Sequence, residues 1–389
     1  MPLSIATLNV NGLRNNQKRD ATFNWLLSKK YDIICLQETH CAQSDIIDWS
    51  NKWKEMGGGD SSWDCGSTDS RGVAILLNKS CREDITFVQC HLGGRVIKCV
   101  IKTENAFYHI TNVYAHNNSI DKKNFFTSLS NQRDNNIFDD SVEHYYIHLG
   151  DFNCAMEKRI DRSPSHQNDD LGVIELKQLL LRFDLEDTWR KQNPTSRKFT
   201  FQRNNTKSRI DYIFSSKSLS SKIFDSRINN FPFSDHNVVS IKIKLDDIQR
   251  GPGIWVMNLN TIKSDLFKNT FQTWWESWKN ENVKYSDLRE WWDITKTKIK
   301  KITIETSKIL NKSRNKNDIK NLEKQLEDLK SKHHNNSDSA KITDIENIIK
   351  NHYINQAEAA KIRSRAKWAE EGEKSTRYFF ELEKKTGTK

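Results

Sequence analysis

The sequence predicts an α/β fold in which two β-sheets pack between helices, followed by an α-helical extension. Up to about residue 245, short apolar runs of β-type alternate with turns and a few helical segments. An Arg-Gly-Pro-Gly sequence at residues 250–253 interrupts this pattern. Beyond it, apolar residues recur at helical spacing. We therefore expect a first domain over residues 1–248 and a basic helical linker over residues 249–389.

The first domain contains many short elements of both kinds. The expected helices are Lys18–Ser28, Lys122–Gln132 and Gly172–Phe183. Three consecutive strands after residue 84 predict an antiparallel meander, while the order of the other strands stays open. The expected strands are Ser4–Val10, Asp32–Glu38, Val73–Asn78, Ile85–Cys90, Val96–Thr103, Phe107–Tyr114, Tyr145–Asp151, Phe199–Gln202, Ile210–Ser215 and Val238–Leu245.

The linker has the pattern of a helical hairpin. Ile319, Leu322, Leu326 and Leu329 follow the spacing of a coiled-coil seam, and 333–339 is expected to form a polar turn. A second apolar stripe follows, made of Ile342, Ile345 and Ile349. Seven of the twelve tryptophans lie in this part of the chain. At helical spacing, such tryptophans fill a core more often than they bind nucleic acid.

Composition indicates a polar protein with a polyanionic partner. The formal net charge is +11, of which +8 falls after residue 250. Clustered Lys and Arg release counterions from phosphates, although such charge also occurs on an ordinary solvated surface. No run of eighteen apolar residues and no signal-like N-terminus is present, so we expect neither a membrane helix nor secretion. The seven cysteines contain no zinc-type pair, which favours reduced thiols.

Polar side chains at strand ends are the candidates for chemistry. Phosphodiester hydrolysis needs charge neutralisation, an activated water and in-line geometry, and Mg²⁺ prefers oxygen ligands. Asn9 closes the first strand, Glu38 follows the apolar run 33–36, and Tyr114 ends another strand. Asp151 and Asn153 flank a phenylalanine at a further strand end. Each of these signals is weak alone: Glu38 is also typical of a loop entry, Tyr114 of an ordinary strand and Asp151 of a turn, whereas Asn9, still within its strand, is less easily explained in this way.

Two further motifs suggest an acid/base pair. Asp211 lies inside an otherwise apolar strand, where an aspartate needs a partner. Asp235 and His236 precede the last strand of the domain, and a histidine there is suited to proton transfer or charge stabilisation. A buried carboxylate such as Asp211 could orient it. Each motif is a weak signal alone, but the whole set in this order is specific.

In this order, the motifs resemble those of the endonuclease/exonuclease/phosphatase superfamily. They are Asn9, Gln37-Glu-Thr39, Asn112-Val-Tyr114, Gly150-Asp-Phe-Asn153, Arg209-Ile-Asp211 and Ser234-Asp-His236. The resemblance covers residues 3–245 and implies a four-layered α/β sandwich of two mixed sheets flanked by helices. Within the superfamily, the chain is similar to the apurinic-endonuclease-like domain of non-LTR (LINE-type) retrotransposons. His116 stands where that family usually has proline, which puts the local loop shape in doubt.

The extension adds to this resemblance. Gly251-Pro-Gly-Ile-Trp255, the tryptophan pairs, and the segment from Arg363 to Phe380 are similar to the connector that precedes a reverse transcriptase in the second open reading frame. A reverse transcriptase is therefore expected C-terminal to this chain. The extension is either a platform that binds nucleic acid, including the element's own RNA, or a linker whose charge only aids solubility.

The resemblance implies a Mg²⁺-dependent endonuclease, with Mn²⁺ as a substitute metal. Glu38 would bind the metal, with Asn9 and Asp235 as direct or water-mediated ligands. Either Asp151 or His236 would be the general base, Asn153 would position the water, and Tyr114 and the His236–Asp211 pair would contact the phosphate. A nick with a 3′-hydroxyl would prime reverse transcription. The implied DNA contacts are Arg14, Asn117, Arg162, Thr200, Arg203, Lys207, Ser208 and Arg209.

Other functions fit the same motifs. A cellular abasic-site repair endonuclease shares the catalytic set but is not expected to carry the extension. A phosphoinositide phosphatase and a degenerate nucleic-acid-binding module are further alternatives. The substrate places the action in the nucleus after synthesis in the cytoplasm; the lysines at 296–301 are only a weak import signal.

Overall fold

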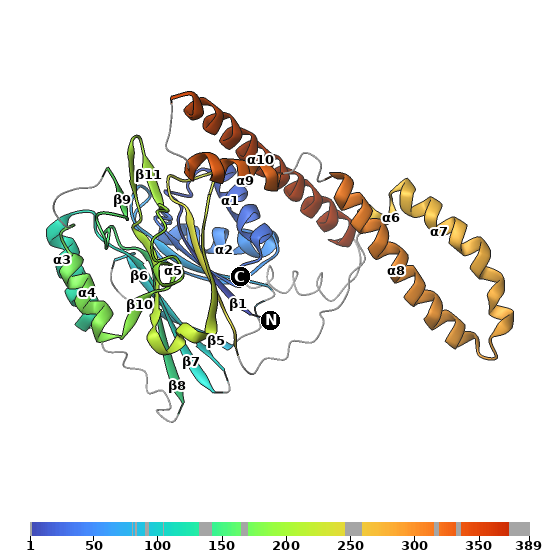
Figure 1. Cartoon of the computed structure of the whole chain (residues 1–389). Helices are drawn as coiled ribbons and strands as arrows, with labels where there is room; N and C mark the ends of the chain where they lie inside the picture. Colours follow the sequence, from blue (N-terminus) through green and yellow to red (C-terminus); the bar gives the residue numbers. More distant parts are fainter. Residues whose placement is uncertain are drawn as a thin grey trace, which may run out of the picture. The chain divides into compact units, whose positions relative to one another are not determined.

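The computed structural model describes residues 2–79, 81, 84–89, 93–103, 105–131, 142–164, 170–245, 259–314, 319–331 and 336–372 (Figure 1). The chain divides into two compact units. The first comprises residues 1–248 together with 330–389, and the second comprises residues 249–329. The helical part that was predicted as one linker is thus shared between the two units, because its last helix packs on the first domain. The motif 251–255 and the segment 373–380 lie outside the described residues.

The first sheet is mixed. Strands β1 and β2 run parallel, whereas the other neighbours are antiparallel. Its order is β14 (Ile223–Asn229), β15 (Val238–Ile243), β1 (Leu3–Asn9), β2 (Ile33–Gln37), β4 (Val73–Asn78) and β3 (Gly58–Asp64). The register sets Asn9 beside Gln37 at the carboxyl ends of β1 and β2. Polar side chains that follow these strands are therefore delivered to the same rim.

The second sheet is also mixed, with β7 and β8 parallel. Its order is β10 (Leu185–Asp187), β13 (Asp211–Ser216), β8 (Glu143–Asp151), β7 (Ala106–Tyr114), β6 (Val96–Lys102) and β5 (Asp84–Gln89). Strands β5, β6 and β7 form the predicted antiparallel meander. A small third sheet has the order β11 (Phe201–Arg203), β12 (Thr206–Ser208) and β9 (Arg162–Ser163).

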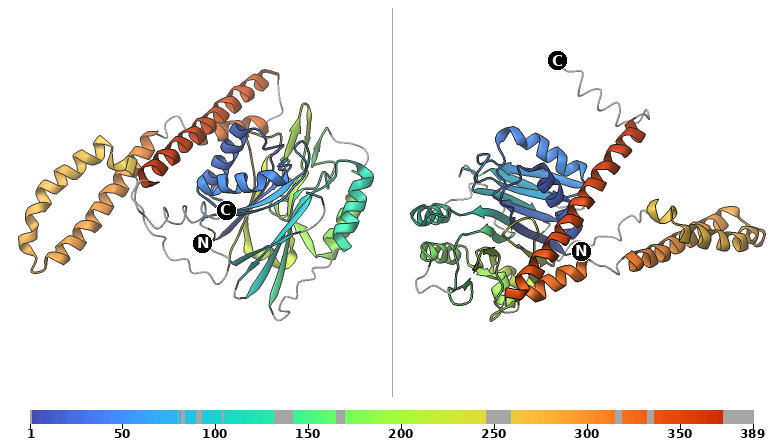
Figure 2. Two further views of the ribbon diagram at one scale, coloured as in Figure 1. Left: turned by 180° about the vertical axis from the view of Figure 1, so that it is seen from behind. Right: turned by 90° about the horizontal axis from the view of Figure 1, so that it is seen from above.

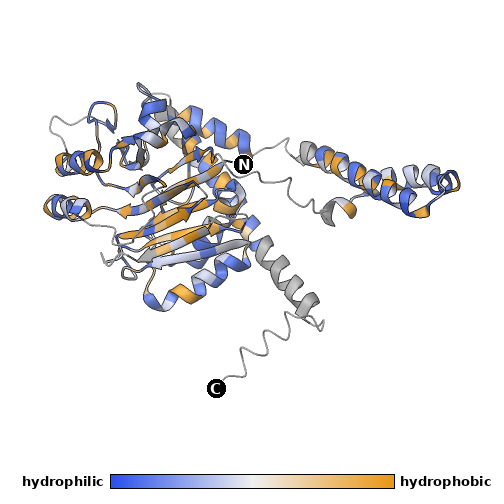
Figure 3. Ribbon diagram, turned by 90° about the horizontal axis from the view of Figure 1, so that it is seen from below, coloured by the Kyte–Doolittle hydropathy of each residue, from blue (hydrophilic) through white to orange (hydrophobic). Residues whose placement is uncertain are grey.

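The core lies between the two large sheets. Leu3, Ile33, Ile110, Ile147 and Leu149 are fully buried and belong to one apolar cluster that spans both sheets (Figure 3). Helices α1 (Asn16–Lys29) and α2 (Ile46–Glu55) cover the first sheet. Helices α3 (Ser119–Asn131) and α4 (Val173–Arg182) pack on the second sheet, through a separate cluster that includes Phe126 and Leu176 (Figure 2). The four-layered sandwich is confirmed.

Local sequence explains where the helices lie. Asn15 caps α1 because its side chain accepts a hydrogen bond from Lys18 N at 2.9 Å, and Lys30 ends the helix in a left-handed conformation with φ 57°. The three predicted helices of the first domain are present. Helix α2 was not predicted, although Trp49 and Trp53 lie one turn apart and are both buried.

Every predicted strand of the first domain has a counterpart, whereas the edge strands β3, β10 and β14 and the two-residue strand β9 were missed. Strand β3 begins with Gly58-Gly59 and contains polar residues, so it has little of the side-chain pattern of a strand. The predicted turn at 333–339 is wrong for residues 336–339, which begin helix α10 (Asn336–Gly372); residues 332–335 lie outside the described residues. The six described cysteines form no disulfide.

Helix α10 packs on α1. Its buried side chains are Ile349, Tyr353 and Ala357, which recur every four residues and so share one face. The Tyr353 ring meets Trp25 of α1 edge-on, with 6.4 Å between ring centroids. The two helices lie side by side in Figures 1 and 2. The last described helix therefore belongs to the same unit as the sheets.

The second unit consists of helices. They are α6 (Leu259–Ile262), α7 (Asp265–Trp278), the 3₁₀ helix η3 (Lys279–Lys284), α8 (Leu288–Arg314) and α9 (Ile319–Ser331) as far as Leu329. The buried Trp278 of α7 donates to Thr295 Oγ1 of α8 at 2.8 Å, and Lys298 Nζ lies 3.3 Å from the centre of its ring. Trp278 therefore packs in the core of this unit, as expected for a tryptophan at helical spacing. Trp292, in contrast, is half-exposed.

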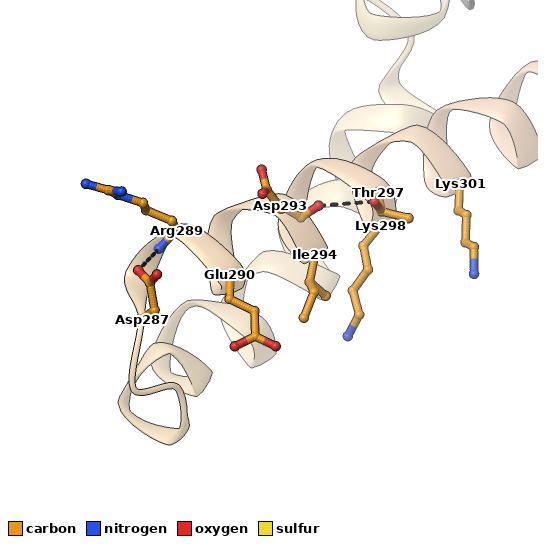
Figure 4. Close-up of a pocket in the computed structure, with 8 residues that line it drawn as sticks. All are labelled: Asp287, Arg289, Glu290, Asp293, Ile294, Thr297, Lys298 and Lys301. Atoms are coloured by element: carbon orange, nitrogen blue, oxygen red, sulfur yellow. Dashed lines mark hydrogen bonds between the residues drawn. The ribbon is translucent and has the colours of Figure 1, made fainter.

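A hollow of about 590 Å³ lies on α8 and the turn before it (Figure 4). Its lining mixes acidic side chains such as Asp293 with basic ones such as Lys298. None of the candidate catalytic residues lines it. None of the described helices is both long and apolar enough to cross a membrane.

The core position of Leu149 leads to a stability prediction. Leu149→Ala removes a fully buried side chain between the two sheets and should lower the free energy of unfolding by about 2–5 kcal/mol. Leu181→Ala, on the exposed face of α4, is the control and should change it by less than about 0.5 kcal/mol. Denaturant unfolding followed by circular dichroism measures both. Equal effects would contradict the assignment of the core.

Candidate active site

The two sheets bring the predicted residues to one rim. Asn9 ends β1, Glu38 follows β2, and Tyr114 and Asp151 end the parallel strands β7 and β8, where they lie opposite each other in register. Asp211 begins β13 and is paired with Asp151. Strand ends are rigid, so these side chains start from fixed positions.

Asn9 connects the two carboxylates at this rim. Its Nδ2 donates to Glu38 Oε1 and to Asp151 Oδ2, both at 2.9 Å. Its Oδ1 accepts from the backbone N–H of Asn11 at 3.0 Å. Asn9 is fully buried, and these three bonds define which end of its amide faces the carboxylates. Because nitrogen faces them, Asn9 acts here as a positioning residue, while its predicted metal contact remains untested.

Glu38 lies in a left-handed turn just beyond β2, with φ 50°. The turn is held by the neighbouring loop, because Gly12 N donates to Glu38 O at 2.7 Å. The carboxylate is partly exposed, unlike those of Asp151 and Asp211. Burial and the charge of Glu38 raise the pKa of the neighbouring Tyr114 above its usual range, so the phenol stays protonated. Tyr114 is therefore a hydrogen-bond donor at this site.

His236 and Asp211 form a buried pair. His236 Nδ1 lies 2.9 and 3.1 Å from the two Asp211 oxygens, and Nε2 lies 3.9 Å from Asp151 Oδ2. Burial lowers the pKa of His236, but the charge and hydrogen bond of Asp211, followed by Asp151 and Asp235, outweigh it and raise the pKa to about 10. The Asp151 carboxyl has a raised pKa, caused first by burial and then by the charge of Asp211.

Asn153 and Asp235 complete the rim. Asn153 has φ 49°, its N–H donates to Asp151 Oδ1 at 2.9 Å, and its Nδ2 donates to Ala115 O at 2.9 Å. Lys122, which sequence analysis did not single out, donates to Asn153 O at 2.5 Å. Asp235 Oδ1 accepts from Asn11 Nδ2 at 3.1 Å. The structure thus gathers all eight predicted catalytic residues at one rim.

The donor set fits a hard divalent cation. Within the described residues, Asp151, Asp211 and His236 form a group whose ligand atoms lie within 4.8 Å of one another. Both Asp211 oxygens already face His236, and a protonated imidazole cannot ligate a metal. Glu38, whose partly exposed carboxylate accepts from Asn9 Nδ2, therefore provides the carboxylate oxygens best suited to a hard divalent cation.

A β-hairpin is joined to the histidine loop. Phe201 of β11 forms a bridge with His236, Gln202 N donates to Asp235 O at 3.0 Å, and Asn237 N donates to Thr200 O at 2.6 Å. The turn at Asn204, with φ 52°, leaves Arg203 exposed and Lys207 half-buried. The predicted hairpin is confirmed, and its basic tip is held in a fixed relation to the active site.

Three of the residues predicted to contact DNA are buried and contact other residues of the protein. Arg209 is 1% exposed and is enclosed by Asp161 and Asp187, with N···O distances of 2.6–2.9 Å. Thr200 is buried, and its Oγ1 accepts from the backbone N–H groups of Ile210 and Asp211 at 3.0 Å. Ser208 is buried as well. Thr200 and Arg209 therefore hold the strand that carries Asp211.

The remaining predicted contacts lie nearer the surface. Asn117 and Arg14 are exposed, and Arg14 pairs with Asp45. Arg162 is partly buried and pairs with Asp170 at 2.5 Å. Sequence analysis missed the Asp161 cluster, because the partners of this aspartate, Arg190 and Arg209, are distant in sequence.

A second polar bridge between the sheets was also missed as a functional feature. Gln37 Nε2 donates to Asn112 Oδ1 at 2.6 Å and to Thr7 Oγ1 at 2.9 Å. Asn112 Nδ2 donates to the carbonyl oxygens of Leu36 and Ala74. All of these groups are buried, so the bridge fixes how β7 meets β2 beneath the site.

The fold and site define a class of enzyme. The chain belongs to the endonuclease/exonuclease/phosphatase family, whose model matches residues 6–236. Together with the acidic cluster, this membership supports a metal-dependent nuclease.

Relatives narrow the comparison further. The chain is 29% identical over 396 residues to the transposon TX1 uncharacterized 149 kDa protein of Xenopus laevis; the match covers all of this chain and 29% of that protein. An AP endonuclease of Leishmania major has a TM-score of 0.51 and 16% identity over 63% of this chain and 88% of its own. An AP endonuclease of Archaeoglobus fulgidus has a TM-score of 0.50 and 22% identity over 62% of this chain and all of its own. These two structures share the fold.

Arg209 gives a prediction that separates structure from DNA contact. Arg209→Met leaves buried carboxylates without their main partner and should cost about 3–5 kcal/mol of stability. Arg203→Met, at the exposed hairpin tip, should change stability by less than about 0.5 kcal/mol and weaken DNA binding instead. Thermal unfolding and duplex binding distinguish the two. A stable Arg209→Met variant with weakened binding would return Arg209 to the DNA contacts.

The His236–Asp211 pair should behave as one catalytic group. His236→Gln should reduce the rate of DNA cleavage by about 10²–10⁴-fold. Asp211→Asn added to it should cause little further loss, because the aspartate acts through the histidine. Single-turnover rates of the two single variants and the double variant form the test. Multiplicative losses would mean that Asp211 acts independently of His236.

Proposed function

We propose that this chain is a Mg²⁺-dependent endonuclease that nicks duplex DNA and leaves a 3′-hydroxyl for priming reverse transcription. The observation that carries the proposal is the set of polar side chains at the strand ends, in which Asn9 Nδ2 joins Glu38 and Asp151 while Asp211 orients His236. A basic hairpin anchored to the His236 loop is suited to duplex DNA.

The residues divide the chemistry among them. Glu38 would hold Mg²⁺, or Mn²⁺ in its place, with Asn9 and Asp235 as the other predicted contacts, direct or through water. When bound, the metal would neutralise charge on the phosphate and leaving oxygen. A protonated His236 donates to a phosphate oxygen and stabilises its negative charge, and Tyr114 donates to the same group.

The charges around His236 and Asp151 also favour one of these two residues as the general base. His236 is held in its protonated form by Asp211, so it is poorly suited to accept another proton. Asp151 has a raised pKa and lies beside Asn153, which makes it a better base for aligning and deprotonating the attacking water. This supports Asp151 as the base and His236 as the electrostatic group, among the two assignments that the motifs leave open.

The similarity to a transposon protein supports a retrotransposition role over repair. The match covers the whole chain, including the helical extension, whereas the AP endonucleases cover 63% and 62% of it. On this proposal a reverse transcriptase follows the chain, the protein acts in the nucleus, and the basic extension binds the element's own RNA. An abasic-site endonuclease is the second candidate, supported by the shared fold.

Supercoiled plasmid separates these functions. The full chain should convert it to relaxed circles when Mg²⁺ is present and not in EDTA. Glu38→Ala should abolish nicking, because a carboxylate for the metal is lost. Glu55→Ala, at an exposed position of α2, is the matched control and should retain the wild-type rate.

A comparison of intact plasmid with plasmid that contains abasic sites distinguishes the nicking function from the repair function. Cleavage of intact plasmid, followed by extension of the nick by a DNA polymerase, is expected. If only plasmid with abasic sites were cut, the repair function would replace the proposal. If neither were cut, the nuclease proposal would be wrong for this chain.

A further inference from the structure

Arg95 lies against Tyr114, the phenol donor of the active site. Arg95 directly precedes β6, and its carbonyl oxygen accepts from Tyr114 N at 2.8 Å. In the other direction, Arg95 Nη1 donates to Tyr114 O at 3.3 Å. The guanidinium also lies over the Tyr114 ring, with its carbon Cζ 5.0 Å from the ring centre. Three separate contacts thus join this arginine to one tyrosine of the site.

The register of the second sheet explains why these two residues meet at the rim. Val96 of β6 is paired with Val113 of β7, so Arg95 and Tyr114 are the next pair beyond the end of this ladder. On the other side of β7, Tyr114 is paired with Asp151 of β8. The backbone of Arg95 therefore lies across Tyr114 from the carboxylate strand.

The segment that leads into Arg95 is tied to the loop of Glu38. Gly94 O accepts from Gly72 N at 3.0 Å, and Gly72 O accepts from Thr39 N at 3.0 Å. Thr39 directly follows Glu38 in the chain. Backbone hydrogen bonds thus hold the arginine in a fixed relation to the carboxylate that would bind the metal.

The charge of Arg95 opposes the effect of the carboxylates on Tyr114. Burial raises the pKa of Tyr114, the charges of Glu38 and Asp151 raise it further, and the charge of Arg95 lowers it. A positive charge beside a phenol favours negative charge on its oxygen, so the O–H becomes a stronger hydrogen-bond donor.

The guanidinium is not placed to satisfy its own hydrogen bonds. Arg95 Nε is buried and has no hydrogen-bond partner among the described residues. The Nε of Arg209, in contrast, donates to Asp161 at 2.8 Å. An unpaired buried donor destabilises the folded chain, so folding alone does not account for this placement of Arg95.

We propose that Arg95 is a positioning residue for catalysis, which holds the Tyr114 ring and strengthens its O–H as a donor to the scissile phosphate. The inference rests on the proposed function, in which Tyr114 donates to that phosphate. Arg95 acts through the tyrosine and does not itself contact the substrate. It is not among the residues that the sequence motifs assign to the site.

A double-mutant cycle with Tyr114 tests this coupling in the full chain. Single-turnover cleavage of a labelled duplex over a range of enzyme concentrations gives the rate and the apparent affinity. Arg95→Met should lower the rate about five- to twentyfold and change the affinity less than about twofold. In a Tyr114→Phe background it should lower the rate less than about twofold, because the O–H through which it acts is gone. Arg95→Lys, which keeps the charge, should recover most of the rate.

Lys222→Met is the matched control. Lys222 Nζ lies 5.1 Å from the centre of the Tyr145 ring, which belongs to the core at the opposite end of β8 from Asp151. This variant should cleave like the wild type, and thermal unfolding checks that every variant is folded. Equal losses from Arg95→Met with and without the Tyr114 hydroxyl would overturn the inference. A loss confined to DNA affinity would also overturn it, because it would indicate a direct DNA contact.

Titration of the phenol separates this inference from the proposed function. Tyr114 is replaced by trifluorotyrosine, which ionises at lower pH than tyrosine, and fluorine NMR follows its ionisation without metal or DNA. Arg95→Met should move the ionisation to higher pH, because a charge that favours the phenolate is lost, and Arg95→Lys should restore it. An unchanged titration would contradict the inference even in a chain that cleaves DNA. A shifted titration in a chain that cuts no duplex would support the coupling and refute the proposed function.

Discussion

The structure depends on one shared amide, that of Asn9, which holds carboxylates from two different sheets. Glu38 follows the first sheet and Asp151 ends a strand of the second, and both accept from Asn9 Nδ2 at 2.9 Å. Two carboxylates brought together in a buried place repel each other unless a donor or a cation lies between them. The amide of Asn9 supplies that donor without adding a charge. The packing of the two sheets therefore also sets how the two carboxylates lie relative to each other. The Gln37–Asn112 bridge beneath Asn9 reinforces this alignment of the sheets.

The elements around this centre act by holding particular strands. Thr200 and Arg209 fix the segment that carries Asp211, while the hairpin bridge at Phe201 fixes the loop of His236. The hairpin tip is exposed, but its base belongs to the catalytic framework.

Much of the fold could be predicted, because buried strands carry continuous apolar runs and their ends carry conspicuous polar residues. The recurrence of Asn9, Glu38, Asp151 and His236 in a family order located the site even though no single motif was specific. Whether a side chain points into the protein or toward solvent could not be predicted in the same way. Arg209 looks like a surface cation until Asp161, distant in sequence, is placed against it. Strand β3 was missed because an edge strand beginning with two glycines is specified by its neighbour β4 and not by its own side chains.

The helical extension shows why charge alone is a weak guide to function. Its net charge of +8 is compatible with an RNA platform, a DNA contact or a soluble linker. Position distinguishes these possibilities, because a lysine contributes to phosphate binding only where the fold holds it near a phosphate. The seat of Tyr353 on Trp25 holds α10 against α1 of the nuclease domain. The buried apolar stripe of α10 is thus what gives part of the basic extension a defined place on the nuclease domain.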